Sequence, residues 1–181
     1  MTFPTPIERL WNELERVRAD VLGEVERLSQ RQADWRSDAG AWSIGEIVDH
    51  VTIAENETGK LTSKLLKEVQ AGSAAAIFPH DLTEFAAPPP FPPGPTEAPP
   101  VVRPGHGKPI GELVAGLKAV RRRTRESMER LAGCDPRQLK FKHFRFGDLD
   151  LGQWWRLHAA HERTHLQHLR DVKAAPGFPT A

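Results

Sequence analysis

Four stretches of this chain repeat apolar side chains at intervals of three and four residues, which is the period of an amphipathic helix. They cover about residues 5–28, 43–71, 109–132 and 150–175. Each stretch is long enough to bury an apolar stripe against neighbouring helices, and no segment shows a convincing strand alternation. The pattern therefore predicts an all-α fold, a four-helix bundle.

Polar residues at the expected helix starts support these boundaries. Thr5 precedes a proline, so its hydroxyl is expected to cap the first helix. Ser43 and Glu46 have the spacing of a capping box at the start of the second helix. Asp150, with Gln153 three residues later, is expected to begin the fourth helix. Residues 29–40 break the helical period and predict a connection with one helical turn.

The segment between the second and third expected helices is rich in proline. Eleven of the 16 prolines lie between Pro79 and Pro109, including the run Pro88-Pro89-Pro90. Each proline removes a backbone donor and restricts φ, so residues 72–108 are not expected to form a helix or a central strand. We predict a long crossover there. It could form a wall of a substrate site, or equally serve as a spacer or a docking segment.

The charge balance favours neither nucleic acid nor an anionic membrane as a partner. The chain has 25 Lys and Arg against 24 Asp and Glu, a formal net charge of +1. The run Arg121-Arg122-Arg123 spreads around a helix, and Glu126 and Glu129 follow it closely. We therefore interpret this run as a solvated face rather than an anion-binding stripe.

Length and cysteine content predict one cytoplasmic domain over residues 1–181. Cys134 is the only cysteine, so it cannot form an intramolecular disulfide, and a packed thiol is favoured over a nucleophile. No segment reaches the roughly 18 to 20 apolar residues that span a bilayer. Helical bundles commonly pair through exposed apolar edges, which allows a homodimer.

The fourth expected helix carries a stripe of histidines. His158, His161, His165 and His168 are spaced by three, four and three residues, so they share one face. Buried imidazoles cost free energy unless their nitrogens find partners. A metal ion is a partner that satisfies several imidazoles together.

The pair His161 and His165 has the i, i+4 spacing that lets two rings converge on one ion. His50, in the second expected helix, shares a face with Ile47 and Ala54 and is therefore also expected to point inward. These residues by themselves leave two readings open. One is a metal site, and the other is a purely structural stripe that mediates packing or dimer contacts.

The run Trp42-Ser43-Ile44-Gly45-Glu46-Ile47-Val48-Asp49-His50 has the pattern W-S-x-x-E-x-x-x-H. This pattern resembles a motif of the DinB-like superfamily, which includes the YfiT-like metal-dependent hydrolases and the bacillithiol S-transferases. Three later segments also resemble motifs of this superfamily. His143-Phe-Arg-Phe-Gly147 resembles H-P-x-F-G, and Leu151 with Gln153-Trp154 resembles L-x-x-Q-W. His161-Glu-Arg-Thr-His165-Leu166 resembles H-x-x-R-H-L. The chain departs from these motifs at three positions, which we expect to affect the surroundings of the site rather than its ligands: Phe144, Thr164 and His168.

The resemblance implies an up-down-down-up bundle in which His50, His161 and His165 bind a divalent metal. It implies a metal-dependent enzyme, either an S-transferase that joins a low-molecular-weight thiol to an electrophile or a hydrolase that uses metal-bound water. Three imidazole ligands leave coordination positions open, and zinc is the expected ion, although nickel or iron would also accept imidazole. The alternative is a metal-binding or stress-response bundle without turnover.

Further side chains near the expected ligands each have a functional and an ordinary interpretation. Those that could support the ligands are His143, His158, His168 and Glu57. The ordinary interpretation is favoured for each: a half-buried or structural histidine, or a solvated carboxylate. Core packing is likewise favoured for Trp42 and Trp154, and exposure to solvent for His80 and His106.

Overall fold

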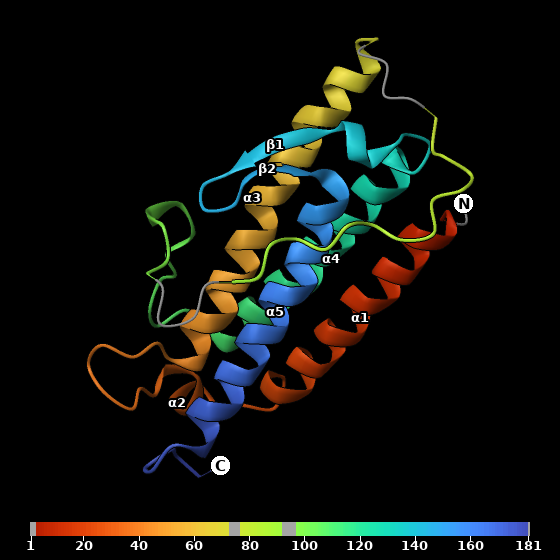
Figure 1. Cartoon of the computed structure of the whole chain (residues 1–181). Coiled ribbons are helices and arrows are strands. Elements are labelled where there is room, and N and C mark those ends of the chain that lie inside the picture. The colour runs from red at the N-terminus through yellow and green to blue at the C-terminus, as the bar shows by residue number, and fades with distance from the viewer. Residues whose placement is uncertain (1–2, 73–76, 92–96, 181) are drawn as a thin grey trace.

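A computed structural model describes residues 3–72, 77–91 and 97–180, and its long helices form a bundle (Figure 1). These helices are α1 (Thr5–Val25), α3 (Ile44–Gln70), α4 (Ile110–Leu131) and α5 (Leu151–Ala174). In Figure 1, α1 and α5 run in one direction and α3 and α4 in the other. The predicted all-α fold and its up-down-down-up order are confirmed.

The helix starts agree with the predicted caps at two of three positions. The Ser43 hydroxyl accepts a hydrogen bond from the Glu46 N–H at 3.2 Å, and the Glu46 carboxylate accepts one from the Ser43 N–H at 2.9 Å. Asp150 and Gln153 form the same box at α5. The predicted hydroxyl cap at Thr5 is wrong, because Thr5 already lies inside α1 and no side chain caps this helix. Prolines before and after Thr5 have no N–H to satisfy, which lessens the need for a cap.

The connection after α1 contains the predicted helical turn, whereas two later connections contain more structure than the sequence pattern indicates. The turn is the five-residue helix α2 (Gln30–Asp34). A 3-10 turn, η2 (Pro136–Gln138), follows α4. The sequence pattern predicts no strands, yet residues 140–150 form an antiparallel hairpin of β1 (Lys140–His143) and β2 (Gly147–Asp150). Four-residue strands are too short for a period-two pattern to be informative.

Two large apolar clusters fill the bundle, one toward each end, and a smaller third one of Leu149, Trp154 and Leu157 lies beside the hairpin. One large cluster contains Ile7, Leu14 and Leu131, and the other contains Val25, Ile47 and Leu169. Between the two large clusters each long helix contributes one buried charged side chain, and these four are Arg18, Glu55, Arg121 and Glu162. We call these four residues the charged layer.

The charged layer is closed by ion pairs between all four helices. Arg18 contacts Glu55 at 2.7 Å and also pairs with Glu162. Arg121 contacts Glu55 at 2.9 Å and Glu162 at 2.6 Å. The interpretation of the arginine run as a solvated face is therefore wrong for Arg121, although the two arginines that follow it are exposed. A run of identical residues gave no signal that one of them faces two buried carboxylates.

The described parts of the proline-rich crossover pack on the bundle. Residues 73–76 and 92–96 of the predicted 72–108 segment lie outside the described residues. Ile77 forms an isolated antiparallel bridge with Cys134 beyond the end of α4. Phe85 is buried against the start of α5, and the Arg156 side chain donates a hydrogen bond to the Phe85 carbonyl oxygen. A 3-10 turn, η1 (Pro100–Val102), contacts α3.

Two further expectations concern Cys134 and membrane insertion. Cys134 is half-buried beside the first apolar cluster, and burial raises the pKa of its thiol, which agrees with a packed thiol. Within the described residues, none of the helices combines the length and the apolar character that crossing a membrane requires.

Candidate metal centre

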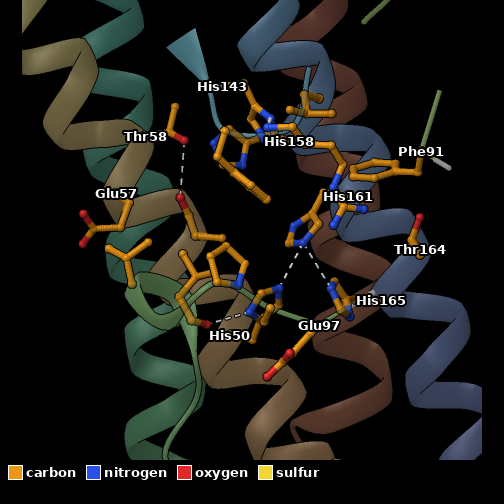
Figure 2. Close-up of a pocket in the computed structure, with 18 of the residues that line it drawn as sticks. His50, Glu57, Thr58, Phe91, Glu97, His143, His158, His161, Thr164 and His165 are labelled. Carbon is orange, nitrogen blue, oxygen red and sulfur yellow. Dashed lines mark hydrogen bonds between the residues drawn. The ribbon is translucent and has the colours of Figure 1, made fainter. Parts of the chain in front are cut away.

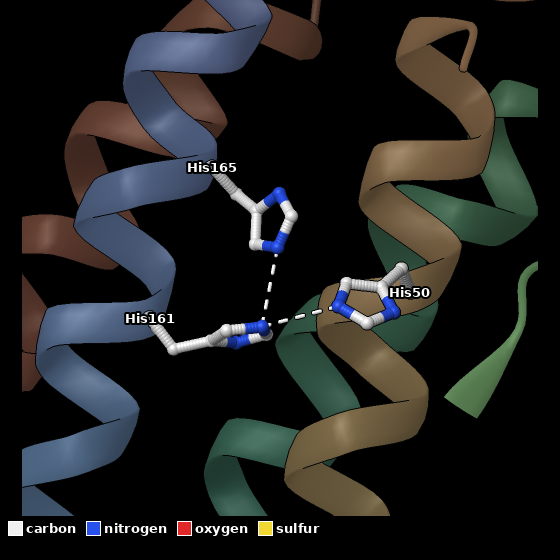
Figure 3. Close-up of side chains that lie close together, drawn as sticks. All are labelled: His50, His161 and His165. Atoms are coloured by element: carbon white, nitrogen blue, oxygen red, sulfur yellow. Dashed lines mark hydrogen bonds between the residues drawn. The ribbon is translucent and has the colours of Figure 1, made fainter. Parts of the chain in front are cut away.

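Three histidines from two helices, His50 of α3 and His161 and His165 of α5, converge on one another (Figure 3). His161 Nε2 lies 3.1 Å from His50 Nε2 and 3.1 Å from His165 Nε2. In a tetrahedral zinc site with Zn–N bonds of about 2.0–2.1 Å, two ligand nitrogens are about 3.3 Å apart. Two of the three nitrogen pairs are thus within a few tenths of an ångström of this spacing, and all three ligand nitrogens lie within 4.8 Å of one another, so the predicted convergence of these residues is confirmed.

The imidazole of His50 is oriented by the crossover. Its Nδ1 lies 2.8 Å from the carbonyl oxygen of Val102, so Nδ1 carries the proton and donates it to that oxygen. The Nε2 lone pair then points toward His161 and His165. This is the arrangement in which a metal-ligating histidine is held through its other ring nitrogen.

Burial keeps the three rings neutral. Burial lowers the pKa of His50, and burial together with the neighbouring rings lowers the pKa of His161 well below its ordinary value. Burial, followed by the influence of His50 and His168, lowers the pKa of His165 to about 3. Neutral imidazoles offer lone pairs, so the three residues are in the protonation state that metal binding needs at neutral pH.

His165 also has an unsatisfied nitrogen. Its Nδ1 is buried and has no hydrogen-bond partner among the described residues. An unpartnered buried nitrogen is uncommon in a folded protein. Burying this nitrogen costs free energy of desolvation, and no hydrogen bond among the described residues offsets that cost.

One side of the histidine cluster opens into a pocket of about 1060 Å³ (Figure 2). Side chains of α3 and α5, the hairpin and the crossover line it. The lining includes Phe91 and Val102 of the crossover, so the interpretation of this segment as a pocket wall is supported. Because three imidazoles leave the ligand set of a four-coordinate ion incomplete, an ion held there could accept a further ligand from the pocket.

Trp42 lies beside the candidate ligands at the edge of the core. It is half-buried, lines the pocket, and its ring centroid is 4.9 Å from that of His50 and 6.3 Å from that of His165. The core-packing interpretation holds in part for Trp42, because its side chain also packs against the second apolar cluster. It holds for Trp154, which is buried and donates a hydrogen bond from Nε1 to the Phe141 carbonyl at 3.2 Å.

His143 has the structural role that its sequence context favours. Its Nδ1 accepts hydrogen bonds from the backbone N–H groups of Arg145 at 3.1 Å and Phe146 at 3.2 Å, which organises the hairpin turn. The next residue, Gly147, has φ of 72°, a conformation that other residues rarely adopt. His143 is buried and forms part of the pocket lining.

The other three candidate supporting residues line the pocket without a hydrogen bond to the triad among the described contacts. His158 is partly buried, and its Nε2 has no partner among the described residues. The His168 ring lies 6.1 Å from that of His165. Glu57 is paired with Lys60 at the rim. The two crossover histidines, His80 and His106, are exposed as expected.

Two features of the site gave no usable signal in the sequence. The Val102 acceptor is a backbone carbonyl, so no side chain marks it. Asp49 directly precedes the candidate ligand His50, and nothing in the sequence marks its partners. Its carboxylate accepts hydrogen bonds from the Gly105 N–H and the Lys108 ammonium, each at 2.8 Å, which ties the crossover to α3.

The fold and the histidine cluster together define a helical bundle with a candidate metal centre that faces a pocket. The sequence profile of the DinB superfamily matches residues 13–169. The chain belongs to the DinB superfamily. A crystal structure of TT2238, described as a four-helix bundle protein, is similar in fold, with a TM-score of 0.60 and 19% sequence identity over 90% of this chain and 96% of that one. No curated protein matches the sequence at a significant level.

Proposed function

We propose that this chain is a metal-dependent enzyme in which His50, His161 and His165 bind a divalent ion, with zinc as the expected metal and nickel or iron as alternatives. The observation that carries the proposal is the convergence of three neutral imidazole nitrogens, 3.1 Å from one to the next, at the inner end of a large pocket. This donor set fits a borderline-soft divalent ion.

The reaction that we favour is the transfer of a low-molecular-weight thiol to an electrophile. The bound ion would lower the pKa of a coordinated thiol or water molecule, so that it acts as a nucleophile at neutral pH. In the transfer, an S–C bond forms, the bond to the leaving group breaks, and the thiol proton leaves with that group. The pocket volume of about 1060 Å³ is at the upper end for small-molecule sites, which gives room for two substrates.

The hydrolase is the runner-up within the same site. The three imidazoles bind an oxygen ligand as readily as a sulfur ligand, so a reaction with water differs only in needing no thiol. A metal-binding module without turnover is the alternative from another class. The surrounding residues would have the same roles in all three functions. The Val102 carbonyl orients His50, and the Trp42 ring packs beside His50 and His165.

Metal content is the first test. We expect near-stoichiometric metal, measured by elemental analysis, in wild-type protein purified without an affinity tag. His50→Ala and His161→Ala should each lose it, whereas His80→Ala, at an exposed crossover position, should retain it. Wild-type protein that stays free of metal after reconstitution with zinc and with nickel would contradict the proposal.

Activity assays distinguish the transferase, the hydrolase and the binding module. The metal-loaded protein is incubated with an aryl halide and a panel of low-molecular-weight thiols, and separately with ester and amide substrates. Thiol-dependent consumption of the halide that is lost in His161→Ala supports the transferase. Hydrolysis without thiol supports the hydrolase, and metal binding without either activity leaves the binding module.

A further inference from the structure

Exposed apolar side chains gather at the mouth of the pocket. Four large hydrophobic residues are conspicuously exposed among the described residues: Ile77, Phe91, Val101 and Phe144. Three of them line the pocket: Phe91 with 39%, Val101 with 64% and Phe144 with 66% of its surface exposed. Single exposed apolar residues are common on proteins, but several around one opening indicate a binding surface.

A series of ring contacts connects this mouth to the metal centre. The Phe91 ring centroid lies 6.1 Å from that of His161 and 5.5 Å from that of Phe146. His143 continues the series, with centroid distances of 4.7 Å to Phe146 and 4.6 Å to Phe144. Figure 2 shows Phe91 approaching from the crossover on the His161 side of the pocket. Aromatic faces and edges thus extend from the candidate ligands to the hairpin tip.

The charges of the lining favour neither an anion nor a cation. Three basic and three acidic side chains line the pocket: Lys60, Lys142, Arg145, Glu57, Glu97 and Asp171. The formal charges cancel, and some of these side chains pair with each other, as Glu57 does with Lys60. Apolar and aromatic contacts therefore remain as the main source of affinity for the outer part of a ligand.

We propose that the pocket binds a ligand with a neutral aromatic or planar apolar group, which lies against the aromatic series that includes Phe91 and Phe144 while its reactive end points toward the three histidines. The inference rests on the proposed function and names the class of its electrophile. The two phenylalanines belong to separate elements, the crossover and the hairpin turn, so both elements would contribute to binding.

The first arm of the test uses metal-free protein, so that it does not depend on the metal. Binding of the neutral fluorophore N-phenyl-1-naphthylamine is measured by fluorescence titration. Phe91→Ala and Phe144→Ala combined should weaken binding about tenfold, because each aromatic contact contributes up to roughly 1 kcal/mol. Ile77→Ala, an even more exposed apolar position outside the pocket, is the control and should leave binding unchanged.

The second arm uses protein shown to contain metal and compares benzohydroxamate with acetohydroxamate, which share a metal-binding head. The wild type should bind benzohydroxamate several-fold more tightly, and the double variant should lose this preference while still binding acetohydroxamate. Far-UV circular dichroism confirms that the variants are folded.

The two arms distinguish the inference from the proposed function. Fluorophore binding that depends on Phe91 and Phe144, in a protein that never binds metal, would contradict the metalloenzyme but support the aromatic site. Equal fluorophore affinity in the double variant and in Ile77→Ala would overturn the aromatic site, as would equal affinity of metal-loaded wild type for the two hydroxamates.

Discussion

The two nitrogens of the His50 ring have separate roles. Nδ1 is held by the Val102 carbonyl at 2.8 Å, and Nε2 faces the other two histidines. The orientation of this ring thus depends on a residue 52 positions away in the chain. Since the acceptor is part of the backbone, substituting Val102 would not remove it, and the contact is best tested through the residues that position the crossover.

Gly152 shows how closely the crossover approaches α5. A Cβ placed at this position would lie 2.6 Å from Cδ1 and 2.8 Å from Cγ of the Phe85 ring. Gly152→Ala should therefore destabilise the protein by about 1–3 kcal/mol, because the buried Phe85 ring would have to move. The measurement is the free energy of unfolding from urea titration.

Gly23→Ala in α1 is the control for this prediction, because a Cβ at Gly23 would have no atom within 4 Å and alanine favours helix. It should leave stability unchanged or raise it slightly. Truncating the ring in the double variant Gly152→Ala/Phe85→Leu should recover part of the loss. A Gly152→Ala variant as stable as wild type would show that Phe85 does not pack there.

The lowered pKa of Glu55 predicts that the folded protein loses stability at acid pH. Burial alone would raise its pKa, but Arg121 and Arg18 outweigh that effect and lower the pKa to about 2. A carboxyl whose pKa is lowered by folding stabilises the folded state above its unfolded pKa of about 4.5. That stabilisation, roughly 3 kcal/mol at this shift, is lost as the pH falls from about 4.5 toward about 2.

The stability difference between wild type and Glu55→Gln should therefore shrink between pH 5 and pH 2. It is measured by denaturant titration at a series of pH values. Protonation of the histidines occurs in both proteins and largely cancels in the difference. A difference that stays constant over this range would mean that Glu55 does not titrate with a lowered pKa.

At the scale of elements, the crossover acts as part of the candidate metal centre. Its position over α3 is set by Asp49, which accepts hydrogen bonds from Gly105 and Lys108 on the C-terminal side of Val102. Asp49 thereby acts on His50 indirectly, through the chain that carries the Val102 carbonyl. This makes it a positioning residue rather than a ligand.

Asp49→Ala should reduce the affinity for zinc by about tenfold, in the range typical for residues that orient metal ligands. The measurement is competition with a chromophoric chelator at constant pH. Asp20→Ala, at an exposed position of α1, is the matched control. If both variants bind zinc like wild type, the crossover does not contribute to the geometry of the centre.

Features that depend on residues close together in the sequence could be predicted, and features that depend on distant residues could not. The helices, the boxes at Ser43 and Asp150, and the facing of His161 and His165 depend on residues within one or two turns, so spacing was enough to predict them. The burial of Arg121 and the position of Trp42 depend on residues far away in the chain. So do Phe91 and the Val102 carbonyl, because the path of a proline-rich segment is decided by tertiary contacts.

At the scale of the whole molecule, the charged layer separates two apolar clusters and joins all four long helices. Glu162 follows His161 directly but points into this layer, where it pairs with Arg18 and Arg121. The ion pairs of Glu162 thus fix the rotation of α5 about its own axis. This rotation decides the direction in which the two candidate ligands of α5, His161 and His165, project. Its four side chains are at most 5% exposed, so none of the charges is well solvated.

Removing one member of this layer should destabilise the whole bundle. Arg18→Met leaves two buried carboxylates with one arginine between them, which should cost about 3–5 kcal/mol. Arg163→Met removes an exposed partner of Glu13 and should cost less than about 1 kcal/mol. The free energies of unfolding from denaturant titration of metal-free protein give both values. Similar small losses in the two variants would show that the layer is solvated in solution, whereas the expected contrast would establish that the stability of the bundle depends on a balanced set of four buried charges.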